Sequence, residues 1–193
     1  MLIYKNLVTK EVLDQCNAEI DSLLPTQRWS SSHTTWGSSL YDGVQGVCMR
    51  AVPTFKTVKI IKDAISSILP PCSKLNMNYH YWLKYSGIGW HNDSARTSGD
   101  RRVFGCTVYL NEWNHKWGGL FVWEDAEDGS LKVISPSPGT VVVNTNTEDH
   151  HVTMISPTAK YARRSGGRRG LAAVVERAPI CGLHGSQPTR EYD

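Results

Sequence analysis

The spacing of apolar residues changes near residue 74, and this change constrains the fold more than any other feature. In KLNMNYHYWLKY, residues 74–85, every second residue from Leu75 onward is leucine, methionine or tyrosine. A period of two is typical of a β-strand with one apolar face. Turn signals such as Asp128-Gly129 separate most of the strand candidates that follow. These candidates are residues 102–110, 119–124, 131–134, 140–145, 151–155 and 168–176.

Two segments ahead of residue 74 have the period of amphipathic helices. Residues 10–24 follow Thr9, a residue type that caps helices, and residues 54–69 end before the helix-breaking pair at 70–71. Residues 28–48, rich in serine, threonine and glycine, predict a loop with room for short strands. The expected apolar faces carry Val12, Cys16, Ile20 and Leu23 on the first helix and Phe55, Val58, Ile61, Ile65 and Ile68 on the second.

Helices followed by seven or eight short strands predict a mainly β, α+β fold. In such a fold a sandwich or barrel is supported by N-terminal helices. The 193 residues suffice for one domain with its own core. We expect residues 1–73 to form helical support and a loop, residues 74–178 to form the β core, and residues 179–193 to form a C-terminal tail.

The composition is that of a globular protein, with 40% hydrophobic and 20% charged residues. The formal charge of +3 is too small to indicate nucleic-acid binding by itself. The N-terminal sequence lacks the pattern of a signal peptide, and no apolar run is long enough to span a membrane. The five cysteines are scattered without a C-x-x-C pair, which argues against a disulfide framework. We therefore expect a cytoplasmic location and no membrane partner.

The stretch GIGWHNDSAR, residues 87–96, places His91 and Asp93 two residues apart at the end of a strand candidate. Residues two apart on a strand project to the same side, so both side chains can reach one metal ion. The two glycines of this stretch predict a turn that presents the pair. Further donors lie in DHHV, residues 149–152. Two imidazoles and one carboxylate form the facial set that binds ferrous iron and leaves positions open.

An arginine opens the last strand candidate, RRGLAAV at residues 168–174. Arg168 shares a strand face with Gly170 and Ala172, which leave room beside its guanidinium. An arginine inside a narrow barrel needs an anion, because a buried unpaired charge is too costly. Its planar guanidinium can hold a carboxylate through two hydrogen bonds. The pattern therefore predicts a position that binds a carboxylate.

The order of these motifs over residues 79–176 resembles that of the iron(II)- and 2-oxoglutarate-dependent dioxygenases, in particular the prolyl-4-hydroxylase-like branch. The motifs are YSG, WHND, VYLNEW, GGLFVWE, PGTVVV, HHVTMI and RRGLAAV. VYLNEW followed by GGLFVW is the signature that discriminates this branch, whereas every branch shares His-x-Asp. The resemblance implies a double-stranded β-helix core of the jelly-roll or cupin type.

The resemblance also assigns the metal ligands. His91 and Asp93 match the first two iron ligands of the family. The distal histidine is either His150 or His151. The family's motif has a valine two residues after this histidine and an aliphatic residue three further on, and this spacing favours His150.

For the cosubstrate, the resemblance places Arg168 at the distal carboxylate of 2-oxoglutarate. Tyr109 is expected to support the same carboxylate, and Tyr85 to reach into the cosubstrate pocket. Eighteen residues separate His150 from Arg168, more than prolyl hydroxylases usually have, and the insert between them is basic. Other arginines therefore remain candidates for the anchor, namely Arg169, Arg164 and Arg163.

The implied activity is that of a 2-oxoglutarate-dependent non-haem iron dioxygenase. Fe(II), 2-oxoglutarate and O2 are the implied cofactor and cosubstrates, with ascorbate as a further candidate. The expected reaction hydroxylates an unactivated C–H bond and releases succinate and CO2. The leading hypothesis for the substrate is a prolyl residue in a peptide or protein.

Three alternatives remain open. The first is hydroxylation of another side chain or of a small molecule such as a free amino acid. Nucleic-acid demethylation is disfavoured, because such demethylases tend to carry two arginines six apart on the last strand, and Val174 stands six after Arg168. A catalytically silent binding module is disfavoured by the complete ligand set.

Overall fold

Residues 1–23, 30–31, 44–69, 74–92, 102–145, 148–157, 159 and 167–176 are described by the computed structural model. Within them the chain forms two α-helices, α1 (Lys10–Leu23) and α3 (Phe55–Ile65), and two short 3-10 turns, Ser66–Ile68 and His115–Trp117. The strands are β1 (Leu2–Tyr4), β2 (Ser30–Ser31), β3 (Val44–Gln45), β4 (Cys48–Ala51), β5 (Lys74–Leu83), β6 (Gly87–His91), β7 (Arg102–Tyr109), β8 (Phe121–Glu124), β9 (Leu131–Ile134), β10 (Val141–Thr145), β11 (His150–Val152) and β12 (Gly167–Glu176).

The strands form two antiparallel sheets. The larger has the order β1-β10-β7-β12-β5-β4-β2, and the smaller has the order β3-β6-β11-β8-β9. Side chains of the two sheets meet in a buried cluster that joins Tyr109 and Val142 of the large sheet to Phe121 and Trp123 of the small one. The expectation of a mainly β fold with N-terminal helices is confirmed, and the expected strand at 74–85 ends at Leu83 as β5.

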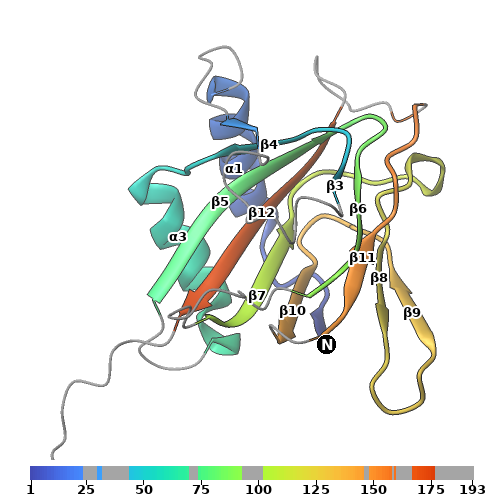
Figure 1. Cartoon of the computed structure of the whole chain (residues 1–193). Coiled ribbons are helices and arrows are strands. Elements are labelled where there is room, and N and C mark those ends of the chain that lie inside the picture. The colour runs from blue at the N-terminus through green and yellow to red at the C-terminus, as the bar shows by residue number, and fades with distance from the viewer. Residues whose placement is uncertain are drawn as a thin grey trace, which may run out of the picture.

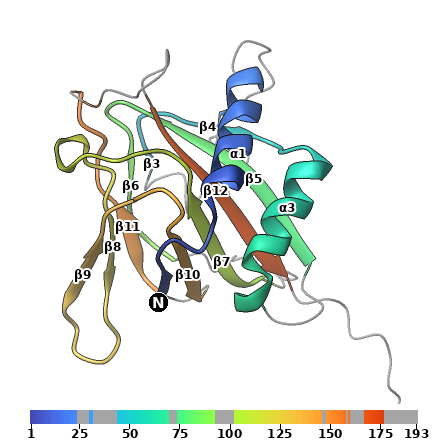
Figure 2. The ribbon, with the colours of Figure 1, turned by 180° about the vertical axis from the view of Figure 1, so that it is seen from behind.

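Both helices lie on the outer face of the large sheet, as Figures 1 and 2 show from opposite sides. A second buried cluster fills the space between them and the sheet. Its members include Cys16 and Ile20 of α1, Ile61 and Ile65 of α3, and Tyr79 and Val108 of the sheet. Because the helices cover one face of the large sheet and the small sheet covers the other, apolar residues occur on both faces of β5, including the buried Trp82.

The second helix is phased differently from the sequence prediction. Its N-cap is Thr54, whose side chain accepts a hydrogen bond from the Thr57 backbone, so Phe55 is the first helical residue and is 85% exposed. The helix buries Thr57, Ile61 and Ile65, and it ends at Ile65 in a 3-10 turn rather than at residue 69. The prediction that Phe55 lies on the apolar face was therefore wrong. No helix among the described residues is long and apolar enough to cross a membrane.

Glu19 of α1 links both helices to the large sheet. Its carboxylate accepts hydrogen bonds from the Thr54 backbone at 2.6 Å, from the hydroxyls of Thr54 at 3.2 Å and Thr57, and from the Tyr79 hydroxyl at 3.3 Å. Thr57 and Tyr79 are buried. One carboxylate therefore satisfies donors of the α3 N-terminus and of β5, which fixes the position of both helices on the sheet.

We expect Glu19→Ala to lower the free energy of unfolding by about 2–4 kcal/mol, because it leaves two buried hydroxyls without their acceptor. Chemical denaturation followed by circular dichroism measures this loss. Asp14→Ala is the matched control on the same helix. Asp14 forms an exposed ion pair with Lys10 at 2.5 Å, and such a solvent-screened pair contributes little to stability. Equal losses for the two variants would contradict the linking role of Glu19.

Candidate metal centre

The structure brings His91 and His150 together across two neighbouring strands. His91 is the last residue of β6 and His150 the first of β11, and the two residues are direct partners in the antiparallel ladder. Their ring centroids lie 4.3 Å apart at an interplanar angle of 56°. Directly opposed residues of an antiparallel pair share a sheet face, so both imidazoles point the same way. Two histidines 59 positions apart in the sequence thus become neighbours.

In each imidazole, Nδ1 lies close to the backbone carbonyl oxygen of the residue two positions earlier in the chain. His91 Nδ1 lies 2.8 Å from the Gly89 carbonyl oxygen, and His150 Nδ1 lies 2.9 Å from that of Glu148. A carbonyl oxygen can only accept, so each Nδ1 donates a proton and each Nε2 carries the lone pair. Metal-binding histidines usually have this arrangement, in which a backbone group fixes the tautomer and the orientation of the ring. The donor chemistry of the pair therefore fits a divalent metal ion.

The surroundings of His150 are apolar and closely packed. Its side chain is 4% exposed, and its ring stacks on Phe121 with centroids 5.0 Å apart and an interplanar angle of 18°. Trp123 is its ladder partner on β8. These aromatic side chains restrict the rotation of the imidazole and exclude water from one of its sides.

His151 belongs to the opposite face of the small sheet. Its ring contacts Trp90, the residue before His91, with centroids 4.5 Å apart. Burial lowers the pKa of His151, and the nearby His150 lowers it further. Since neighbouring residues of a strand project to opposite faces, His151 and Trp90 form a pair that backs onto the His91–His150 pair.

The third predicted ligand, Asp93, lies outside the described residues. The described residues contain no group of three or more His, Cys, Asp or Glu side chains that could hold a metal ion. Asn92, between His91 and Asp93, donates from Nδ2 to Asp149 Oδ1 at 3.0 Å. This bond ties the segment after His91 to the residue before His150. This link was not predicted from the sequence, although both residues flank predicted ligands.

Residues 77–165 match the family model of the 2OG-Fe(II) oxygenase superfamily. This part of the chain is therefore similar to members of that superfamily. The superfamily's description implies oxidoreductases that use Fe(II), 2-oxoglutarate and O2. The resemblance that the sequence motifs carry is thereby confirmed. A search of curated protein sequences finds no match.

Solved prolyl hydroxylases have a similar fold. A prolyl-4-hydroxylase from Pseudomonas putida is 17% identical, with a TM-score of 0.64 and 92% of each chain covered. A prolyl hydroxylase from Trichoplax adhaerens, solved with a fragment of hypoxia inducible factor, is 14% identical, with a TM-score of 0.70 over 91% of this chain and 82% of that one. A viral collagen prolyl hydroxylase from Paramecium Bursaria Chlorella virus-1 is 13% identical, with a TM-score of 0.60 over 92% and 96%. These likenesses confirm the double-stranded β-helix core.

The ladder of β12 gives different partners to the two arginines at its start. Arg168 is opposite Trp82 of β5, whereas Arg169 is opposite Tyr81. Two residues further on, Gly170 is opposite Tyr109 of β7. Arg168 is therefore in register with the same sheet face as Tyr109, which belongs to the buried cluster between the two sheets. Arg163 and Arg164, the other candidates for the anchor, lie outside the described residues.

The two predicted tyrosines have different environments. Tyr109 is buried at the end of β7 and packs in the cluster that contains Phe121, the residue stacked on His150. Tyr85 occupies the turn between β5 and β6, where its φ is 62° and its side chain is 60% exposed. The structure thus places Tyr109, and not Tyr85, in the cluster next to the histidine pair.

Gly87 also differs from its expected position, because it opens β6 instead of forming the turn. A Cβ atom at Gly87 would lie 2.8 Å from the Val152 carbonyl oxygen. The absence of a side chain therefore permits the close approach of β6 to β11. This glycine contributes to the pairing of the two histidine-bearing strands.

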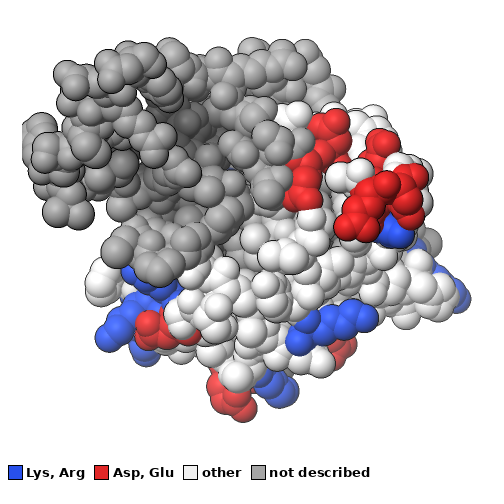
Figure 3. Space-filling view, turned by 90° about the horizontal axis from the view of Figure 1, so that it is seen from below, with Lys and Arg blue, Asp and Glu red and all other residues white. Residues whose placement is uncertain are grey.

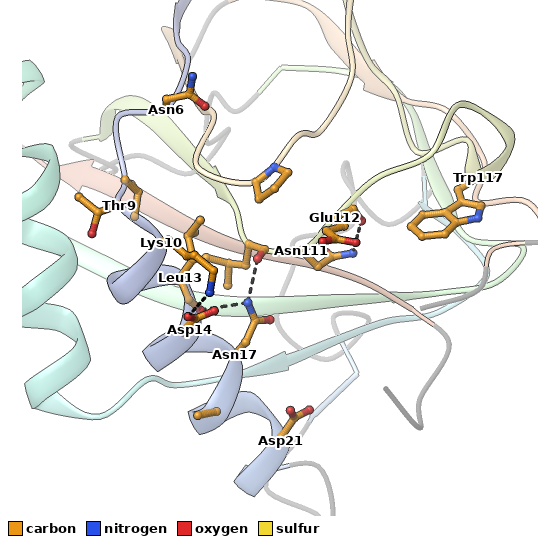
Figure 4. A pocket seen from close by; sticks show the side chains of 14 residues that line it. Asn6, Thr9, Lys10, Leu13, Asp14, Asn17, Asp21, Asn111, Glu112 and Trp117 are labelled. Carbon is orange, nitrogen blue, oxygen red and sulfur yellow. Dashed lines mark hydrogen bonds and ion pairs between the residues drawn. The ribbon is translucent and has the colours of Figure 1, made fainter. Parts of the chain in front are cut away.

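A cavity of about 790 Å³ lies along α1 (Figure 4). Asn17 at its wall donates to the Leu110 carbonyl at 2.8 Å and so ties α1 to the end of β7. None of the predicted site residues lines this cavity. Its wall consists of Asn6, Val8, Thr9, Lys10, Leu13, Asp14, Asn17, Ala18, Asp21, Leu110, Asn111, Glu112, Trp117 and Pro138.

Two buried cysteines among the described residues are poor nucleophiles. Cys16, Cys48 and Cys106 are buried, and none of them forms a disulfide within the described part of the chain. Burial raises the pKa of Cys16 to about 11 and that of Cys106 to about 12. Both thiols therefore stay protonated at neutral pH, and covalent cysteine chemistry is disfavoured at these positions.

Proposed function

We propose that this oxygenase binds Fe(II) through His91, Asp93 and His150 and hydroxylates a prolyl residue in a peptide or protein. The observation that carries the proposal is the opposed pair of imidazoles, each with Nδ1 bonded to a backbone carbonyl. Asp93 follows His91 by two residues and supplies the carboxylate of the facial set. Ascorbate is proposed as an accessory reductant.

In this proposal the residues of the chain orient the two histidine ligands and exclude water from the site. When bound, Fe(II) and 2-oxoglutarate supply the oxidising chemistry with O2. The Gly89 and Glu148 carbonyls keep the Nε2 atoms of the two histidines directed to one point. Phe121, stacked on His150, keeps that ring from rotating and shields it from water. A rigid and partly dry site of this kind is what controlled oxidation of a C–H bond requires.

We place the distal carboxylate of 2-oxoglutarate at Arg168, with Tyr109 beside it. Their shared register parity in the ladder of β7, β12 and β5 supports this assignment. A guanidinium and a phenol hydroxyl together can satisfy a carboxylate that is removed from water. Tyr85 remains a proposed contact at the rim of the cosubstrate pocket, and its exposed side chain is compatible only with a peripheral position there. Release of succinate and CO2 is part of the proposal.

The prolyl substrate is supported by likeness to other proteins. Several of the similar solved structures are prolyl hydroxylases, and one of them was solved with a peptide fragment. The motifs VYLNEW and GGLFVW of the prolyl-4-hydroxylase-like branch fall in the segment that matches the superfamily. A peptide or protein is therefore the substrate class that we propose.

A single screen tests the reaction and its substrate class. The purified chain is incubated with Fe(II), 2-oxoglutarate and O2, together with proline-rich peptides, free amino acids or methylated oligonucleotides. We expect succinate formation coupled to a mass gain of about 16 Da on a proline of a peptide. His91→Ala is the control, and it should form neither product.

The other outcomes separate the alternatives. A gain confined to free amino acids would move the substrate to small molecules, and one confined to oligonucleotides would overturn the prolyl proposal. Iron-dependent turnover by His91→Ala would overturn the metal site itself.

A further inference from the structure

Strand β9 forms an edge of the small sheet. Among the described residues it pairs only with β8, and the order of the sheet ends with it. In Figure 1 the β8–β9 hairpin projects away from the helices at the margin of the molecule. An edge strand presents backbone groups that another strand can pair with.

The hydrogen-bonding phase of the hairpin shows which backbone groups face outward. Asp125 N donates to Ser130 O at 2.9 Å, which makes this the bonded pair nearest the turn. Bonded and non-bonded pairs alternate in an antiparallel ladder, so Lys132 and Ile134 bond to β8, while Leu131 and Val133 face away from it. No described residue bonds to the outward N–H and C=O groups of Leu131 and Val133. The edge can thus accept one more strand.

The side chains of these two residues are exposed as well. Leu131 is 62% and Val133 is 56% exposed. Val133 is opposite Val122, Val122 is opposite His151, and His151 contacts Trp90. An apolar and aromatic row therefore crosses the outer face of the small sheet and ends at the open edge. Exposed apolar residues on an open edge indicate a surface for strand pairing.

The turn of the hairpin is acidic. Glu124, Asp125, Glu127 and Asp128 lie within it or next to it. Lys132 is 3.9 Å from Asp125 and 3.6 Å from Asp128, so four carboxylates have one nearby ammonium group. The Ser130 backbone N–H donates to Asp128 Oδ1 at 2.8 Å, and hydrogen bonding from Ser130 lowers the pKa of Asp128 and keeps it ionised. Figure 3 shows acidic side chains gathered on the side of the molecule where the hairpin lies.

We propose that the β9 edge binds an extended segment of a partner protein, with apolar residues along the strand and lysine or arginine beside the hairpin turn. Backbone pairing with Leu131 and Val133 supplies affinity, and the carboxylates select basic sequences. The same charges disfavour an acidic segment. The proposal does not depend on the metal site, so a variant without His91 should bind as the wild type does.

The test uses fluorescently labelled ten-residue peptides in which valine alternates with lysine or, in the control, with glutamate. Fluorescence anisotropy with the full chain should show binding of the lysine peptide at least about tenfold tighter than that of the glutamate peptide. Val133→Pro removes an outward N–H and spares the bonds to β8, so it should weaken binding at least about fivefold. Val133→Thr keeps the N–H and is the matched control.

A second variant tests the charges without changing the strand. Glu127→Lys with Asp128→Lys alters exposed turn residues and should remove the preference for the lysine peptide. Thermal melting checks that both variants fold. Equal binding of the two peptides, or unchanged binding by Val133→Pro, overturns the proposal. Dimerisation of the free chain that Val133→Pro abolishes in sedimentation would assign the edge to a second copy and also overturn it.

Discussion

We expect His150→Ala to weaken divalent metal binding by more than about 100-fold and to abolish turnover, whereas His151→Ala changes either by less than about threefold. Removing a residue that only orients a metal ligand lowers metal affinity about 10–100-fold, and removing the ligand itself lowers the affinity further. The reason for the contrast is the strand. His150 shares a face with His91, and His151 lies against Trp90 on the other face. Anaerobic titration of the apoprotein with Co(II), followed by absorbance, measures the affinity without any turnover.

His151→Ala serves as the control for His150→Ala, because both substitutions remove an imidazole from the same strand. Thermal melting should show that each variant folds. A larger loss of Co(II) affinity in His151→Ala than in His150→Ala would contradict the assignment of the distal ligand.

The second large effect concerns the two arginines at the start of β12. We expect Arg168→Gln to raise the KM for 2-oxoglutarate at least about 30-fold, which corresponds to about 2 kcal/mol for a charge-assisted contact. Arg169→Gln should raise it less than about threefold, since Arg169 is opposite Tyr81 and has the other register parity. Steady-state kinetics with 2-oxoglutarate as the varied substrate measure both values. A role in anchoring should appear mainly in KM, with a smaller effect on kcat.

Isothermal titration of 2-oxoglutarate into the metal-loaded protein provides the check by direct binding. The two variants remove one positive charge each from adjacent positions, so a general electrostatic effect would make them equal. Equal losses, or a loss only in Arg169→Gln, would contradict the choice of Arg168. In that second case Arg169 would be the anchor.

The chemistry of the chain could be predicted from the sequence because it depends on residue types in a fixed order. His91-x-Asp93, the histidines of DHHV and the arginines of RRGL are all recognisable without a structure. The period of two in residues 74–85 likewise predicts a strand, since alternation across a strand is a local property of the backbone. The β fold confirms the second prediction, and the match over residues 77–165 supports the first at the level of the superfamily, while the roles of the single residues stay predictions.

The tertiary structure decided which of these residues meet. Sequence spacing favoured His150 over His151, but only the pairing of β6 with β11 shows which imidazole lies against His91. Tertiary contacts also decide which face of the second helix is buried. Glu19 of α1 accepts hydrogen bonds from Thr54 and Thr57 at the start of that helix, and Phe55 lies in solvent.

The open edge at β9 also depends on the tertiary structure. The sequence predicts a strand at 131–134, but whether a strand has one neighbour or two depends on the order of the sheet. Local sequence determined the elements and the reactive groups, because periodicity and side-chain chemistry are properties of short segments. Strand order and register determined the faces, the neighbours and the free edge, because they depend on contacts between residues far apart in the chain.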